Sequence, residues 1–179
     1  VLGSIGLFRE AILTPAMILW INLVTDSVPA ITLGLEPPEP DILKRPPWSI
    51  KPLLGKSGLV FIGYIGLVLA ALSWTLSHTL SPLAIATATY LTLSIGELAH
   101  SYNMRSPYKS LLEIGLLSNK YHILGYLAGL ALAIIPIYIA PWLLGAIPLD
   151  IESLIYIILI SHIIIIVEEF RKRITRKIP

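Results

Sequence analysis

Two acidic residues, Asp26 and Glu97, lie deep inside long apolar stretches of the sequence. A charged side chain within a membrane costs roughly 2.5–3.5 kcal/mol or more, so an acid in such a position is a functional candidate by default. The chemistry open to it is cation binding, because hard cations such as Ca²⁺ are coordinated by oxygens of carboxylates, carbonyls and hydroxyls. These two residues are therefore the first candidates for a site.

The residues around Asp26 read WINLVTDSVP and offer further oxygens. Asn22, Thr25 and Asp26 stand at i, i+3 and i+4, so an α-helix places them on one face. Pro29 has no N–H, so the helical bond to the carbonyl of Thr25 is lost and that oxygen becomes available. We therefore predict a helix that is unwound near Asp26–Pro29 and binds a cation there. The alternative is a proline kink whose polar groups bond neighbouring helices.

Glu97 belongs to a stripe of polar residues at helical spacing, together with Tyr90, Ser94 and Ser101. Such stripes also hold membrane helices together, so the alternative for Glu97 is a protonated residue of the core. At about 1.5 Å per residue, Asp26 lies roughly 17 Å and Glu97 roughly 21 Å from the same side of the membrane. We predict that the two acids share one cation site or form two adjacent ones.

The histidines add little to this pattern. His100 lies one turn beyond Glu97 and could pair with it, although helix packing accounts for it as well. His122 falls near the end of an apolar stretch, where we expect it to meet lipid headgroups. No metal-binding spacing such as HExxH occurs in the sequence.

The elements that must carry these residues are membrane helices. The sequence is 55% hydrophobic and only 13% charged, whereas soluble domains are about 25% charged. A spanning helix needs about 20 apolar residues, and a helix satisfies its own backbone in lipid. The predicted fold class is an all-α membrane protein, a polytopic bundle of about five transmembrane helices at residues 15–34, 59–79, 83–103, 121–140 and 151–170.

Basic residues fall almost entirely on one side of the predicted bundle. They follow the first, third and fifth spans, whereas the links at residues 77–82 and 141–150 contain none. Because Lys and Arg accumulate in cytoplasmic loops, we predict that the loop 35–58 and the C-terminus are cytoplasmic. The first span then begins outside, so we expect a further span before Val1 and a chain that is part of a longer protein.

Motifs for catalysis are absent from the sequence. It has no GxxxxGK(S/T) phosphate loop, no GxGxxG, no cysteine and no soluble segment long enough for a nucleotide-binding domain. We therefore expect no catalytic residue, no cofactor-binding residue and no nucleic-acid partner in this chain.

Two stretches resemble P-type cation-transporting ATPases. One is similar to the sixth transmembrane helix and following loop of the calcium-pump branch, and reads LTPAMILWINLVTDSVPAITLGLEPPEPDILKRPPW. The other is similar to the eighth helix and its cytoplasmic exit, and reads ELAHSYNMRS. The resemblance covers essentially the whole chain. It implies that residues 1–179 form the C-terminal transmembrane cation-transport domain of such a pump, helices six to ten.

The resemblance also assigns roles to particular positions. The cation ligands that it implies are Asn22, Thr25, Asp26 and Glu97, with Asp26 bridging the ions in two-site members. It implies Ca²⁺ as the transported ion, while ATP and Mg²⁺ would act only in domains outside this chain.

The partners implied are the lipid bilayer, the upstream helices and the cytoplasmic ATPase domains of the same pump. The loop with Asp41, Lys44 and Arg45 would contact the phosphorylation domain. Alone, the chain is expected to be inactive and to bind Ca²⁺ weakly or not at all, because its ligands fall short of the about 6–8 oxygens that Ca²⁺ takes.

Two other functions are compatible with the same residues. One is a freestanding membrane protein derived from such a pump, acting as a regulatory subunit, an anchor or an ion-conducting bundle. The other is a pump for manganese, sodium or protons, because oxygen ligands of this kind do not fix the ion.

Overall fold

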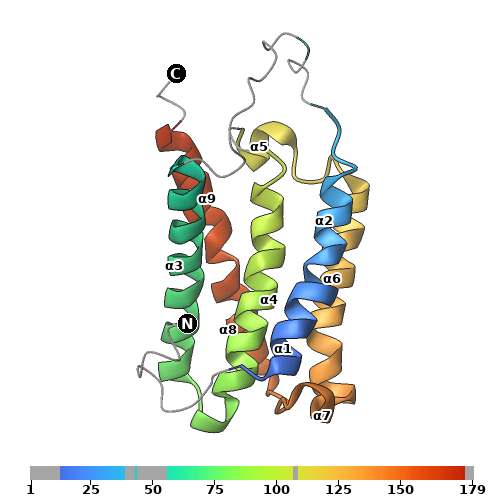
Figure 1. Cartoon of the computed structure of the whole chain (residues 1–179), viewed down its shortest axis with the longest axis vertical. Coiled ribbons are helices and arrows are strands. Elements are labelled where there is room, and N and C mark those ends of the chain that lie inside the picture. Colours follow the sequence, from blue (N-terminus) through green and yellow to red (C-terminus); the bar gives the residue numbers. More distant parts are fainter. Residues whose placement is uncertain (1–12, 39–42, 44–55, 107–108, 176–179) are drawn as a thin grey trace.

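The computed structural model describes residues 13–38, 43, 56–106 and 109–175. This part of the chain is helical and contains no strand. Five helices are long and apolar enough to cross a membrane, at Pro15–Leu33, Gly58–Leu76, Pro82–Asn103, Lys120–Ile139 and Ile151–Ile174. They stand roughly side by side as one bundle (Figure 1). The prediction of an all-α bundle of five membrane helices is confirmed.

The first span consists of three consecutive segments. They are α1 (Pro15–Trp20), the π-helix η2 (Ile21–Thr25) and α2 (Ser27–Leu33). Thr14 begins α1, because its side chain accepts a hydrogen bond from the N–H of Met17, and a proline at the first helical position suits that start. The N–H of Asp26 then donates to the carbonyl of Ile21, five residues back, at 3.0 Å. The helix is thus not unwound over Asp26–Pro29 as predicted: its interruption is a widened turn at Ile21–Thr25, and α2, which contains Pro29, is α-helical.

The helix α4 lies in the middle of the bundle, between α3 on one side and α2 and α6 on the other (Figure 1). The elements here are α3 (Lys56–Thr79), the short 3-10 helix η4 (Pro82–Ala84) and α4 (Ile85–Asn103). α4 is the least apolar of the five spans and the most buried. Two of its buried hydroxyls donate to carbonyls within the bundle: Tyr90 to Ala133 at 3.2 Å and Thr92 to Ala88 at 2.7 Å. The other four spans are more apolar, as suits helices that face lipid, and the polar residues gather on the central one.

The helix α6 (Lys120–Ile139) packs closely against both α2 and α4 through two glycines. A Cβ atom on Gly125 would lie 2.6 Å from the methyl carbon of Thr32, and one on Gly129 would lie 2.5 Å from a methyl carbon of Leu98. Glycines four residues apart on a membrane helix commonly permit such backbone approach. The short α7 (Pro141–Leu144) follows α6.

The last span consists of α8 (Ile151–Ser161) and α9 (Ile163–Thr175), separated at His162. Asp150 begins α8 by accepting the N–H of Ser153 at 2.8 Å. The short α5 (Leu111–Ile114) lies at the opposite end of the bundle, at the exit of α4 (Figure 1).

The described basic residues lie at one end of the bundle. They follow α4, begin α6 and end α9, and these three helix ends lie together (Figure 1). The opposite end, where α8 begins, carries the acids Asp150 and Glu152. That the basic end faces the cytoplasm stays a prediction. Asp41, Lys44 and Arg45 lie outside the described residues.

Candidate cation site between two membrane helices

A groove with a volume of about 470 Å³ runs between α2, α3 and α4. Its walls are mostly apolar, and its acidic lining residues are Asp26 from the first span and Glu97 from α4. The groove thus brings together the two acids that the sequence placed at similar depth.

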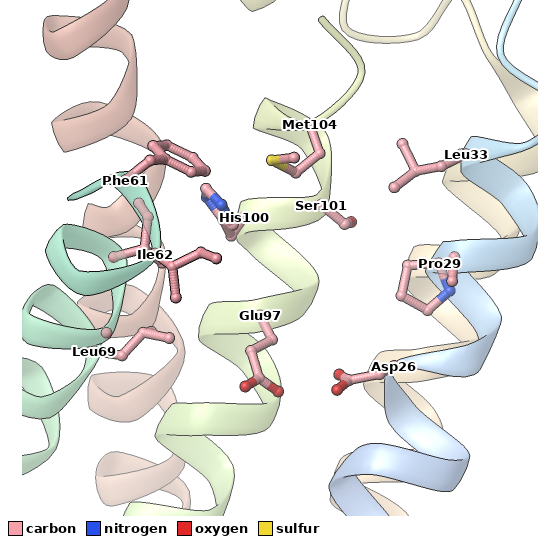
Figure 2. A pocket seen from close by; sticks show the side chains of 13 residues that line it. Asp26, Pro29, Leu33, Phe61, Ile62, Leu69, Glu97, His100, Ser101 and Met104 are labelled. Atoms are coloured by element: carbon pink, nitrogen blue, oxygen red, sulfur yellow. The ribbon is translucent and has the colours of Figure 1, made fainter. Parts of the chain in front are cut away.

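The carboxyl groups of Asp26 and Glu97 point toward each other across the groove (Figure 2). Oε2 of Glu97 is buried and has no hydrogen-bond partner among the described residues. Two ionised carboxylates in a low-dielectric setting repel each other strongly. The arrangement is therefore suited to hold a cation or a shared proton between them.

The structure does not bring Asn22 and Thr25 into this groove. The side chain of Asn22 is exposed, and its amide donates to the carbonyl of Ile18 at 2.8 Å. Thr25 is fully buried, and its hydroxyl donates to the carbonyl of Ile21 at 2.7 Å. Neither residue lines the groove that Asp26 lines, so the three side chains do not form the shared face that the sequence assigned to them. Their role as ligands stays a prediction.

His100 lines the same groove one turn beyond Glu97, but its ring lies near Phe61 (Figure 2). The two ring centroids are 5.9 Å apart. Within the described residues, no group of three or more His, Cys, Asp or Glu side chains could hold a metal ion. Asp26 and Glu97 alone supply about four oxygens at most, and Ca²⁺ takes about 6–8.

A second polar cluster, which the sequence did not reveal, lies where α2 and α4 end. The buried guanidinium of Arg105 forms two bonds to the carboxylate of Glu36, at 2.9 and 2.8 Å. It also donates to the carbonyls of Gly115 and Leu116, at 3.1 and 3.2 Å, and to the hydroxyl of Ser118. These bonds join the exit of α2 to the link between α5 and α6.

Glu36 is charged in this cluster. Burial by itself would raise the pKa of its carboxyl, but the bonds from Arg105 and Asn119 outweigh burial and hold the pKa below its usual range. The amide of Asn119 donates to Oε2 of Glu36 at 2.7 Å. Glu36 and Arg105 are 69 residues apart, and no sequence pattern signals such a pair.

His122 corrects our interpretation from the sequence. It does not meet lipid headgroups, because its side chain is fully buried. Its Nδ1 lies 3.0 Å from the hydroxyl of Thr32 on α2, and its Nε2 lies 3.2 Å from the hydroxyl of Ser101 on α4. The one signal that could have found it is its spacing from Gly125 and Gly129, which places it on the same close-packed face of α6.

Comparison with known proteins gives a consistent family match. Residues 10–174 match the family model described as cation transporting ATPase, C-terminus. The chain is 31% identical over 183 residues to Calcium-transporting ATPase 1 of Bacillus cereus, which covers 89% of the chain and 21% of that protein. It is 33% identical over 136 residues to Calcium-transporting ATPase of Bacillus subtilis, covering 72% of the chain and 15% of that protein.

A mammalian protein is similar over a comparable range. Calcium-transporting ATPase type 2C member 1 of Mus musculus is 30% identical over 176 residues, covering 92% of the chain and 19% of that protein. The chain thus spans about a fifth or less of the length of these curated relatives.

Proposed function

Because the chain belongs to the family of cation-transporting ATPase C-terminal domains, we propose that it forms the ion-binding and translocating part of an ATP-driven calcium pump. It is a multi-pass integral membrane protein with five candidate spans. In this proposal residues 1–179 are the C-terminal transmembrane domain, and the cargo is Ca²⁺. ATP and Mg²⁺ act in other domains of the same pump.

The observation that carries this proposal is the facing pair Asp26 and Glu97 in the groove between α2 and α4 (Figure 2). In lipid, two carboxylates brought together at such depth are costly, and a bound cation offsets both the desolvation and their mutual repulsion. The turn that precedes Asp26 supports the same function, because π-turns inside helices occur frequently at functional sites.

The remaining oxygens must come from elsewhere. Asn22 and Thr25 would reach the ion after a rearrangement of the π-turn, and further ligands would come from helices upstream of Val1. An interrupted helix whose backbone carbonyls help to coordinate an ion is a recurrent device in transporters. This requirement explains why the chain alone is expected to bind Ca²⁺ poorly.

The orientation and the coupling follow from the same proposal. The basic end of the bundle faces the cytoplasm, in agreement with the accumulation of Lys and Arg there. In this proposal the loop that carries Asp41, Lys44 and Arg45 contacts the phosphorylation domain. Movement of that domain would reach Asp26 through the end of the first span.

The test is cation-dependent phosphorylation of the intact membrane protein that carries this sequence. We expect Asp26→Asn and Glu97→Gln to lower its Ca²⁺-dependent phosphorylation by ATP by at least about tenfold, because each removes a charged ligand. Glu152→Gln is the control, since it removes an exposed carboxylate at the other end of the bundle.

Ca²⁺-dependent phosphorylation that survives Asp26→Asn unchanged contradicts the proposal. The same assay with Mn²⁺ or Na⁺ in place of Ca²⁺ identifies the cargo. If Mn²⁺ or Na⁺, but not Ca²⁺, supports phosphorylation, the chain is still the translocating part of a pump, and its cargo is that other ion.

A further inference from the structure

The histidine that joins three helices bears directly on the spacing of the two acids. His122 is on α6, Thr32 is on α2 and Ser101 is on α4. Asp26 lies six residues before Thr32, about 9 Å along the helix, and Glu97 lies four residues before Ser101, about 6 Å along its own. The imidazole therefore bridges the acid-bearing helices one to two turns from the acids themselves.

Both ring nitrogens of His122 are used, and each one serves a different helix. The hydroxyl of Thr32 also lies 2.9 Å from the carbonyl of Pro29, and the hydroxyl of Ser101 lies 2.6 Å from that of Leu98. A neutral imidazole has one donor and one acceptor nitrogen. In either tautomer one hydroxyl accepts from the ring and keeps its own proton for its backbone carbonyl, while the other donates its single proton to the ring in place of its carbonyl. Both tautomers thus keep both bridges between the helices.

The surroundings hold the ring in this position. The N–H of His122 donates to Oδ1 of Asn119 at 3.0 Å, and the amide of Asn119 reaches the carbonyl of Thr32 at 3.4 Å. Tyr102 packs against the ring edge to face, with centroids 4.6 Å apart. Gly125 lets α6 approach Thr32 closely enough for the short imidazole to span the gap. A buried polar group that is fully bonded specifies one arrangement of its partners.

We propose that His122 is a positioning residue that sets the separation of the helices carrying Asp26 and Glu97. Its effect on cation affinity rests on the proposed function, but its effect on helix separation does not. A ring that merely filled space would be replaced best by an apolar side chain of similar size. A bridging ring would be replaced better by glutamine, which has both a donor and an acceptor.

The experiment compares His122→Leu with His122→Gln in the intact membrane protein. Spin labels are attached to Leu33→Cys on α2 and to Met104→Cys at the end of α4, which line opposite sides of the groove (Figure 2). The chain itself has no cysteine, and any cysteine outside it is first replaced. Double electron–electron resonance then gives the distance distribution, and Ca²⁺-dependent phosphorylation gives the half-saturating Ca²⁺ concentration.

We expect His122→Leu to lengthen or broaden the label distance and to raise the half-saturating Ca²⁺ concentration about tenfold, within the usual range of coupling between sites. His122→Gln should restore most of the distance and leave the affinity within about threefold of the parent. Thr32→Val, which removes only the bridge to α2, gives the same readout if His122→Leu does not fold.

The control is His162→Leu, because it removes a different histidine bond of α6. Nε2 of His162 lies 2.5 Å from the hydroxyl of Tyr126, and that bond does not involve α2. We expect the label distance to stay as in the parent.

An unchanged distance in both His122→Leu and Thr32→Val overturns the inference, and so does His122→Leu matching His122→Gln in distance. A parent protein without cation-dependent phosphorylation contradicts the proposed function alone, while the distances still decide the role of His122.

Discussion

Removal of the Arg105 side chain tests whether the cluster at the ends of α2 and α4 holds the two helices together. Every N–H of the guanidinium has an acceptor, two of them on Glu36 and the others on Gly115, Leu116 and Ser118. The side chain of Arg105 is 0% exposed and that of Glu36 is 16% exposed. Arg105→Gln leaves a largely buried carboxylate without its charge partner.

The magnitude follows from that burial. Breaking a buried ion pair by removing one partner costs about 3–5 kcal/mol, and the partial exposure of Glu36 places the expected loss near the lower end. Arg105→Lys keeps the charge but loses the planar fork, so we expect about 1–2 kcal/mol. The assay is unfolding of the membrane protein in mixed micelles of increasing SDS content, followed by tryptophan fluorescence.

The pH dependence gives an independent readout of the same pair. Arg105 and Asn119 hold the pKa of Glu36 below its usual range. The stabilisation is therefore complete above the unfolded pKa, about 4.3, and is lost as the pH falls through the folded pKa. In Arg105→Gln, the free energy of unfolding should therefore decrease less between neutral and acid pH than it does in the parent protein. A cost below about 1 kcal/mol, the range of exposed ion pairs, refutes the reasoning.

Two further predictions concern close packing and the isolated chain. Gly125→Ala should destabilise the protein by about 1–3 kcal/mol, because the new Cβ would lie 2.6 Å from the methyl carbon of Thr32. Gly63→Ala is the control, because nothing lies within 4 Å of the new Cβ there. It should be neutral or stabilise the protein by up to about 1 kcal/mol. The same SDS titration measures both, and equal effects would contradict the packing argument. Isothermal titration of the isolated chain should detect weak Ca²⁺ binding or none; micromolar binding that Asp26→Asn abolishes would show that its own oxygens suffice.

The spans and the facing acids could be predicted because a membrane imposes simple rules. A spanning helix must be long and apolar, so the five spans were visible in the sequence. A constant rise per residue fixes depth, so Asp26 and Glu97 could be placed near one level. Rotation about the helix axis is not fixed in this way. The sequence therefore did not reveal that the side chain of Asn22 is exposed while that of Thr25 is buried.

Partners across helices could not be predicted from one sequence. Thr32 and His122 are 90 residues apart, and neither residue type indicates that the other is its hydrogen-bond partner. His122 near a span end is equally compatible with a headgroup contact, and only the packing of α6 against α2 and α4 distinguishes the two. The same holds for Glu36 and Arg105, which are 69 residues apart.

The π-turn also makes the effect of a deletion in the first span depend on where it falls. A π-turn accommodates one residue more than the α-helical path requires, so a single deletion within Ile21–Thr25 would convert it to ordinary α-helix and leave the segments on either side in place. A single deletion within α1 removes no surplus residue. Asp26 would then rotate by about 100° and shift by about 1.5 Å relative to Thr14, and it would leave the groove although no residue type near it had changed. In this span the place of a deletion, as much as residue identity, determines whether the two carboxylates face each other.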